Sequence, residues 1–313
     1  MLQKTLVKWN KNIIREFPWV NEEDQNMIVG TDFDGIFSAM FLSEVRNYEL
    51  IGFYDFKTIW VRNNANLDEI KDAIWIDLDI YHKDIRSIGH HILKFRKDDK
   101  ILCHKRSLNP NLIRGIYHNN FDRKYPYGTI HFLISLFDYI PKDDELNTLL
   151  LWHPNSSLMN AQKYRPNAHE WLNNFLKIDA MIKTFDDIVT KEFEEKLRDE
   201  IYARIEKTGF TKGRGQISSL NLGLRGYQCT FTNPKKSLTK LNNLILEISK
   251  ITGWKKMNIP SNYKKIEGEI KKLSYSDIKE NYTCFDDFLD EEKVFSYTIP
   301  YRNQIKCTVG IDL

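Results

Sequence analysis

The stretch that decides the fold runs from Met27 to Val45 and reads MIVGTDFDGIFSAMFLSEV. Its first four residues are apolar or small and predict a buried strand, which the polar turn from Thr31 to Gly35 ends. From Ile36 to Val45 the apolar residues recur at helical spacing, so a helix is expected directly after the turn. A strand followed by a tight turn and a helix is typical of a parallel α/β sheet.

The same alternation of short apolar runs and helical patterns continues along the first half of the chain. Further strands are predicted at Leu50 to Tyr54, Thr58 to Val61, Ala73 to Ile76 and Ser87 to Leu93. The pattern predicts an α/β protein with a mostly parallel sheet flanked by helices.

A long amphipathic helix is predicted from Ile178 to Lys207, because apolar residues recur there every three or four positions between charged ones. We interpret it as the connection to a smaller α+β C-terminal domain. The predicted division is residues 1–183, a connecting helix at 184–208, and a basic domain at 209–313. A terminal hairpin is expected to pair Val294 to Ile299 with Lys306 to Ile311.

The charge of the chain is unevenly distributed. The 313 residues carry a formal net charge of only +3, but 13 basic and 3 acidic residues between Lys212 and Lys272 give that segment 13 − 3 = +10. Four aromatic residues lie among these charges: Tyr227, Phe231, Trp254 and Tyr263. This mixture suits a phosphate backbone with bases stacked on rings. The alternative is a solvated basic face over a core that contains the rings.

Several classes of protein are excluded by simple patterns. The four cysteines (Cys103, Cys229, Cys284 and Cys307) are far apart, which argues against a disulfide framework or a cysteine zinc site. No apolar run reaches the length of a signal peptide or of a membrane span. We therefore expect a cytoplasmic protein without a membrane partner, and a homodimer or larger complex stays open.

The first candidate site is the pair Asp32 and Asp34 at the end of the first predicted strand. Side chains at i and i+2 of an extended segment point the same way, and two carboxylates on one side suit Mg²⁺ or Mn²⁺. Open α/β sheets place ligands at this end of their strands. The alternative is a polar turn that caps the helix.

Two more clusters follow within about sixty residues. Asp77 and Asp79 end another apolar strand, and His90 and His91 come close behind. Adjacent histidines on a strand point to opposite faces, so one is expected to bind a metal while the other serves elsewhere, unless a turn intervenes. Three acidic or histidine clusters near predicted strand ends favour a shared metal site over three unrelated structural clusters.

These motifs resemble those of the DHH phosphoesterase superfamily. TDFDGIFSA at 31–39 resembles its first motif, AIWIDLD at 73–79 its second, and IGHHI at 88–92 the Asp-His-His that names it. The Asn109-Pro110 step and the segment 127–133 resemble features that follow in RecJ-like members. The resemblance covers residues 25 to 180 in the family's order.

The chain departs from the family at two places. Gly89 stands where the family has the aspartate of Asp-His-His. The fourth motif, an apolar strand that ends in aspartate, has its best counterpart in the segment 149–155, which has no aspartate. His153 is the candidate replacement, and Asn155 is a weaker one.

The resemblance implies a metal-dependent phosphodiesterase acting on single-stranded nucleic acid, oligonucleotides or small nucleotides. One or two Mn²⁺ or Mg²⁺ ions would be held by Asp32, Asp34, Asp77, His90 and His153. A metal-bound hydroxide would attack phosphorus, with His91, Asp34 and Asp79 in catalytic roles. The substrate-binding candidates are Lys105, Arg106, Asn109 and Arg214.

Two other functions stay open on the sequence. Some proteins of the DHH fold have lost ligands and act as scaffolds that bind nucleic acid or a protein partner, and Gly89 and the missing fourth aspartate favour that reading. The third reading is a haloacid-dehalogenase-type phosphatase, with Asp32 as nucleophile and Asp34 as acid. It leaves the histidine pair without a role.

Overall fold

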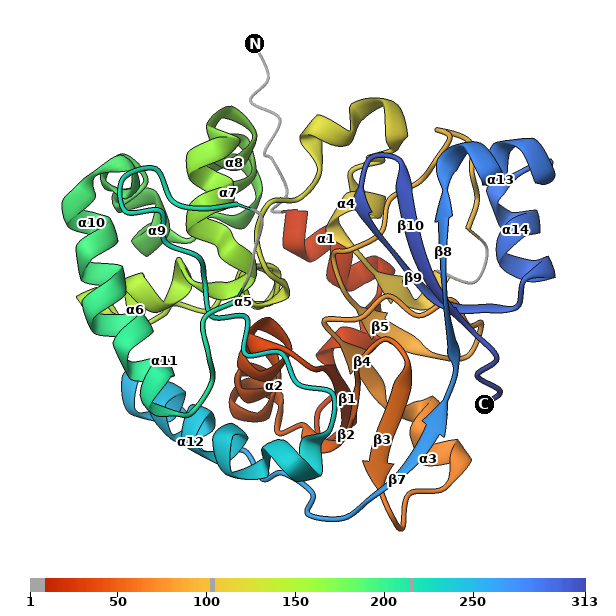
Figure 1. Ribbon diagram of the computed structural model, residues 1–313, viewed down its shortest axis with the longest axis horizontal. Helices are drawn as coiled ribbons and strands as arrows, with labels where there is room; N and C mark the ends of the chain where they lie inside the picture. Colours follow the sequence, from red (N-terminus) through yellow and green to blue (C-terminus); the bar gives the residue numbers. More distant parts are fainter. Residues whose placement is uncertain (1–8, 102–104, 214–216) are drawn as a thin grey trace.

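Ten strands form two sheets within residues 9–101, 105–213 and 217–313, the part of the chain that the computed structural model describes (Figure 1). The strands are β1 (Asn26–Gly30), β2 (Glu49–Tyr54), β3 (Thr58–Arg62), β4 (Ile74–Ile76), β5 (Arg86–Ile88), β6 (Ser107–Leu108), β7 (Tyr263–Glu267), β8 (Glu269–Ser274), β9 (Val294–Tyr301) and β10 (Gln304–Val309).

The main sheet has seven strands in the order β6-β5-β4-β1-β2-β3-β7. Its first five strands are parallel to one another. Strand β3 is antiparallel to β2, and β7 is antiparallel to β3. The chain therefore runs from β1 to one side of the sheet through β2 and β3, and then returns to the other side through β4, β5 and β6.

The central strands β1, β2 and β4 are buried on both faces, which explains why they are largely apolar. In β1, Met27 and Val29 pack into the larger core with helix α2 (Phe33–Arg46), whereas Ile28 packs into a separate core on the opposite face. Strand β4 behaves alike, with Ile74 and Ile76 on the first face and Trp75 on the second.

Helices account for most of the rest of the molecule. They are α1 (Trp9–Glu16), α2 (Phe33–Arg46), α3 (Leu67–Asp72), α4 (Pro110–Ile113), α5 (Thr129–Leu136), α6 (Glu145–Leu151), α7 (Ser157–Lys163), α8 (Arg165–Trp171), α9 (Asp179–Lys183), α10 (Lys191–Lys196), α11 (Ala203–Lys207), α12 (Pro234–Thr252), α13 (Tyr275–Asn281) and α14 (Phe285–Glu291). Helices α6 to α12 lie on one side of the main sheet, and the C-terminal strands lie on the other (Figure 1).

The second sheet is small and antiparallel, in the order β8-β10-β9, and it packs with α13 and α14 around its own core. Its β9–β10 hairpin pairs Val294 with Val309 and Thr298 with Lys306. The predicted fold class and the predicted terminal hairpin are thus confirmed.

Two predicted strands differ from the structure. Strand β5 ends at Ile88, so His90 and His91 lie in the loop after it. The segment 149–151 belongs to helix α6, and the strand expected there from the family resemblance is wrong. A short apolar run fits a buried helix as well as a buried strand, and periodicity alone does not separate them.

The long helix predicted from Ile178 to Lys207 is interrupted. Helix α9 ends at Lys183, and the chain turns at Thr190, whose backbone is extended and whose hydroxyl accepts the Phe193 N–H at 3.2 Å. Helix α10 begins there and runs on to Lys207 through a π-helical segment, η7 (Leu197–Tyr202). A threonine cap thus starts a new helix inside an apolar pattern that looks continuous.

The division into domains at 183/184 and 208/209 does not follow the hydrophobic cores. Buried residues from Phe210 to Met257 belong to the same core as those from Ile13 to Ile205. The separate C-terminal core is formed mainly by residues after 277, together with Tyr81 and the loops that follow His91. Within the described residues, no helix has the length and apolar character needed to cross a membrane.

Candidate metal centre

The candidate site lies where the order of the main sheet reverses. The chain leaves β1 toward β2 on one side, while β4 lies on the other side of β1. Loops diverge at such a switch point and leave a crevice at the carboxyl ends of the strands. Asp32 follows β1 and Asp77 follows β4, so these two strand ends bring both carboxylates to the crevice.

Asp77 is the central residue of the site. It is 3% exposed, and its backbone has a φ of 58°, in the left-handed region that non-glycine residues seldom adopt. Such backbone conformations are concentrated at functional sites, where the surrounding fold holds them. Burial raises the pKa of Asp77 well above that of an ordinary carboxyl, and the neighbouring Asp32 carboxylate raises it further.

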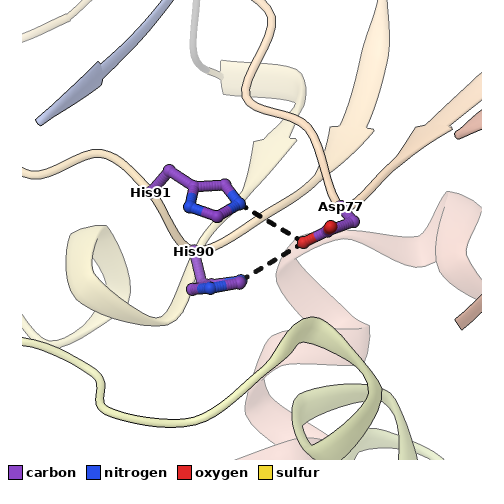
Figure 2. A group of neighbouring side chains, drawn as sticks. All are labelled: Asp77, His90 and His91. Carbon is purple, nitrogen blue, oxygen red and sulfur yellow. Dashed lines mark ion pairs between the residues drawn. The ribbon is translucent and has the colours of Figure 1, made fainter. Parts of the chain in front are cut away.

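Both histidines face Asp77, as Figure 2 shows. His91 Nε2 lies 3.3 Å from Asp77 Oδ1, and His90 Nδ1 lies 3.5 Å from the same oxygen. The two rings are 4.0 Å apart between centroids. They do not point to opposite faces, because β5 has already ended and strand alternation no longer applies, which is the exception that the sequence left open.

A threonine that we did not predict connects His90 to Asp77. The Thr129 hydroxyl donates to Asp77 Oδ1 at 2.7 Å and lies 2.8 Å from His90 Nδ1. A hydroxyl has one proton, so it accepts from a protonated Nδ1. His90 Nε2 then accepts the Asn155 side-chain N–H at 3.0 Å. The weaker candidate Asn155 therefore contacts the site and fixes the orientation of the His90 ring.

Asp77, His90 and His91 form a group that could hold a metal ion. One ligand atom from each lies within 4.8 Å of the other two. Burial lowers the pKa of both histidines, so both rings are neutral near pH 7. The lone pair of His90 is on Nε2 and accepts from Asn155, so this ring can bind a metal only if it gives up that contact, whereas His91 Nε2 faces Asp77 directly. One carboxylate with imidazoles suits Mn²⁺ and other divalent transition metals, so the donor set fits the predicted cofactor class.

Asp34 lies beside this group but is occupied by hydrogen bonds. Its Oδ2 accepts the Thr129 N–H at 2.7 Å and its Oδ1 accepts the Ile130 N–H at 3.1 Å. Burial, and then the charges of Asp77 and Asp32, raise the pKa of Asp34. Asp34 thus attaches the start of α5, and with it Thr129, to the site. A Cβ on Gly128 would lie 2.5 Å from Asp34 Oδ2, so glycine is needed there.

The sequence predicted that the side chains of Asp32 and Asp34 point the same way from an extended segment, but Asp32 has a different role. It caps helix α2, and its Oδ1 accepts the Gly35 N–H at 3.0 Å. A Cβ on Gly35 would lie 2.5 Å from the Gly30 carbonyl oxygen, so glycine lets the helix start against the end of β1. The capping role that we weighed as an alternative is present, and Asp32 also lines the crevice beside Asp77.

Asp79 supports the histidine loop. Its Oδ2 accepts the His91 backbone N–H at 2.8 Å, and its Oδ1 accepts the Asn109 side-chain N–H at 2.7 Å. A Cβ on Gly89 would lie 2.6 Å from Asp79 Oδ2, so the space beside residue 89 already contains the Asp79 carboxylate. Asn109, which was predicted to bind substrate, is fully buried as a partner of Asp79 and a cap of α4.

The crevice has a volume of about 190 Å³. Its walls come from the main sheet and from the C-terminal hairpin, and its polar lining includes Asp32, Asp55, Asp77, Asp79, His91, Ser296, Thr298 and Lys306. His91 lines this space whereas His90 and Asp34 lie behind it. The arrangement places His91 at the open side of Asp77 and His90 at the inner side.

Three predicted site residues lie elsewhere. His153 Nε2 lies 2.8 Å from the Tyr227 carbonyl oxygen, and the ring packs on Phe33, outside the Asp77 group. Lys105 and Arg106 precede β6 at the amino edge of the sheet, where Arg106 donates to the Asp84 carbonyl. Arg214 lies outside the described residues.

The aromatic residues of the basic segment are mostly core. Tyr227, Phe231 and Trp254 are each at most 6% exposed and pack in the larger core, and Tyr263 packs against it. These rings cannot stack on nucleic-acid bases, so the alternative of a basic face over an aromatic core describes them correctly.

Lys124 was also missed by the sequence reasoning. Its half-buried ammonium donates to the Ile299 carbonyl at 2.9 Å. Burial lowers the pKa of Lys124 to about 8, and the nearby Asp79 opposes this shift. No motif marks this lysine, because its closeness to the site depends on the approach of the C-terminal hairpin.

Comparison with known proteins adds no relative. No protein-family model, no curated protein and no solved structure matches this chain.

Proposed function

We propose that this protein is a divalent-metal-dependent phosphodiesterase of the DHH type. The observation that carries the proposal is the convergence of Asp77, His90 and His91 at the switch point of a parallel sheet, with Asp32 and Asp79 beside them. The motif order in the sequence supports the same assignment. Burial raises the pKa values of three neighbouring carboxyl groups, those of Asp34, Asp77 and Asp79, and a divalent cation beside them would favour their ionised forms.

One Mn²⁺ or Mg²⁺ ion is proposed, held by Asp77 and His91 with Asp32 or His90 completing the set. Such an ion polarises a phosphoryl oxygen and lowers the pKa of bound water. The chain itself orients these ligands: Thr129 holds Asp77, Asp79 fixes the His91 backbone, and Asn155 holds the His90 ring. These contacts preorganise the ligand set before any substrate arrives.

The proposed substrate is a single-stranded oligonucleotide. A second polar cavity of about 310 Å³ adjoins the crevice, and Thr230 lines both. Lys236 and Lys240 line this second cavity. A chain with several phosphates can therefore place one at the metal and the next beside the lysines, which favours an oligonucleotide over a substrate with a single phosphate.

The test is a hydrolysis assay on a short single-stranded oligonucleotide and on a dinucleotide. Hydrolysis is expected with Mn²⁺, falling to background when the metal is chelated and returning when Mn²⁺ is added back. Absence of hydrolysis of both substrates with both Mn²⁺ and Mg²⁺ would contradict the proposal.

A scaffold without catalysis is the second candidate. Asn155 favours this reading: its amide contacts His90 Nε2 near the place where the resemblance predicts a fourth metal-binding carboxylate. A scaffold of this kind would bind single-stranded oligonucleotide with equal affinity in Mn²⁺ and in chelator, and would hydrolyse none.

Mn²⁺ binding is expected to release protons at low pH. The raised pKa of Asp77 means that its carboxyl keeps a proton above the ordinary carboxyl range, and the metal must displace that proton. The histidines release none near neutral pH, because their lowered pKa values leave them already neutral. Affinity should therefore rise with pH.

Calorimetric titrations in two buffers of different ionisation enthalpy measure this release. At pH 5 about one proton or more per Mn²⁺ is expected, and fewer at pH 8. Equal affinity and no proton release at both pH values would show that the ion binds to carboxylates that are already ionised.

A further inference from the structure

Strand β10 presents a lysine to the crevice. Ile305 and Cys307 pack into the C-terminal core, so the alternation of the strand directs Lys306 and Thr308 to the opposite face. Thr308 donates to the Phe56 carbonyl on that face, and Lys306 lines the crevice with Thr298, its partner across the hairpin.

The position of this hairpin is fixed by contacts with the rim of the site. The Tyr81 N–H donates to the Phe295 carbonyl at 2.7 Å, and the Ile299 N–H donates to the His91 carbonyl at 3.2 Å. The hydroxyls of Tyr54 and Ser296 lie 2.7 Å apart. The C-terminal sheet is therefore attached to the loops that carry Asp79 and His91. These hydrogen bonds fix the position of Lys306 at the crevice.

Lys306 has a charge that no carboxylate neutralises directly. Its Nζ lies 4.6 Å above the centroid of the Phe56 ring. Among the described residues no carboxylate lies within ion-pair distance of Lys306, and the Asp55 carboxylate in the same crevice acts on it from further away. The other charged groups that line the crevice are the carboxyls of Asp32, Asp55, Asp77 and Asp79. An anionic substrate entering this space meets one ammonium group, which is that of Lys306.

We propose that Lys306 binds a non-bridging oxygen of the substrate phosphate opposite the carboxylates, so that the C-terminal sheet forms part of the active site. This inference rests on the proposed phosphodiesterase function. The Phe56 ring holds the half-buried Lys306 ammonium in place by a cation–π contact, which leaves its N–H donors free. A negatively charged phosphoryl oxygen is the acceptor that this ammonium binds most strongly.

The test compares Lys306→Ala, Lys306→Arg and Lys272→Ala in the full chain. Lys272 pairs directly with Lys306 across β8 and β10 but is exposed and does not line the crevice, so its removal is a matched control. Lys306→Ala is expected to lower kcat/KM on a single-stranded oligonucleotide by about 10- to 100-fold, mainly through KM. Lys306→Arg should retain most of the activity, and Lys272→Ala should equal the wild type.

Mn²⁺ affinity and the melting temperature separate this role from a structural one. Both should change little in Lys306→Ala, because the lysine contacts no proposed metal ligand and its ring contact is with Phe56, which is only partly buried at the edge of a core. Active wild type with Lys306→Ala indistinguishable from Lys272→Ala would overturn this inference alone. Inactive wild type would overturn the proposed function, and this inference with it.

Discussion

Asp77→Asn is expected to abolish measurable Mn²⁺ binding and to lower kcat/KM by about 10³-fold or more. Asp77 Oδ1 is the atom on which both histidines and Thr129 converge, so no other carboxylate in the site can replace it without rebuilding the hydrogen bonds. A metal supplies several kcal/mol of transition-state stabilisation, and each 1.4 kcal/mol is worth about tenfold in rate. Asparagine is the substitution of choice because it tolerates the left-handed backbone at this position.

The same variant should be more stable than the wild type when no metal is present. A buried carboxyl whose pKa is raised lowers the free energy of unfolding at pH values above the ordinary carboxyl range, and this cost disappears as the pH falls. At pH 7, Asp77→Asn should therefore melt at least about 2 °C higher in chelator. Asp72→Ala, an exposed aspartate before β4, is the control.

Calorimetry with Mn²⁺ and melting curves in chelator give both readouts on one preparation. Wild-type Mn²⁺ affinity in Asp77→Asn would place the ion elsewhere. A melting temperature several degrees lower in chelator would mean that Asp77 supports the fold, and a loss of activity would then say nothing about metal binding.

Gly89→Asp, which restores the residue that the DHH resemblance predicts, is expected to damage the protein. The new Cβ would lie 2.6 Å from Asp79 Oδ2 and 2.6 Å from the Leu78 carbonyl oxygen. These are overlaps with a carboxylate and with backbone, and the added charge would lie next to Asp79. We expect a loss of about 3 kcal/mol in the free energy of unfolding. Mn²⁺ affinity should also fall at least about tenfold, since Asp79 holds the His91 backbone.

Gly226→Ala serves as the matched control, because a Cβ there would meet no atom nearer than 3.7 Å. Denaturant unfolding and Mn²⁺ calorimetry measure the two effects. Wild-type stability together with tighter Mn²⁺ binding in Gly89→Asp would show that residue 89 has room for a ligand and that Asp79 does not replace it.

The core of the site could be predicted because it follows from strand ends. Met27 to Gly30 and Ala73 to Ile76 are continuous apolar runs, and the carboxyl ends of parallel strands share one edge of a sheet. Asp32 and Asp77 were therefore placed together without coordinates. The sequence also placed His90 with Asp77, but it did not predict that His91 contacts the same carboxylate oxygen. That contact depends on where β5 ends, and boundaries are the least reliable part of a pattern.

Partners that come from distant segments could not be found in the sequence. Thr129 reaches Asp77 only because Asp34 binds the start of α5, and Lys306 reaches the crevice only because the C-terminal hairpin packs on the loops after β4 and β5. Neither residue belongs to a motif. His153 was a reasonable substitute for a missing carboxylate by residue type, but the segment before it is helical and directs its ring to Tyr227.

The central claim is that one divalent cation binds to Asp77 and His91, with His90 or Asp32 completing the ligand set. Anomalous diffraction from crystals soaked in Mn²⁺ tests it directly. We predict a peak about 2.0–2.3 Å from an Asp77 carboxylate oxygen and from a ring nitrogen of His91 or His90. Peaks found only elsewhere on the molecule, with the contacts between Asp77 and the histidines unchanged, would contradict the account.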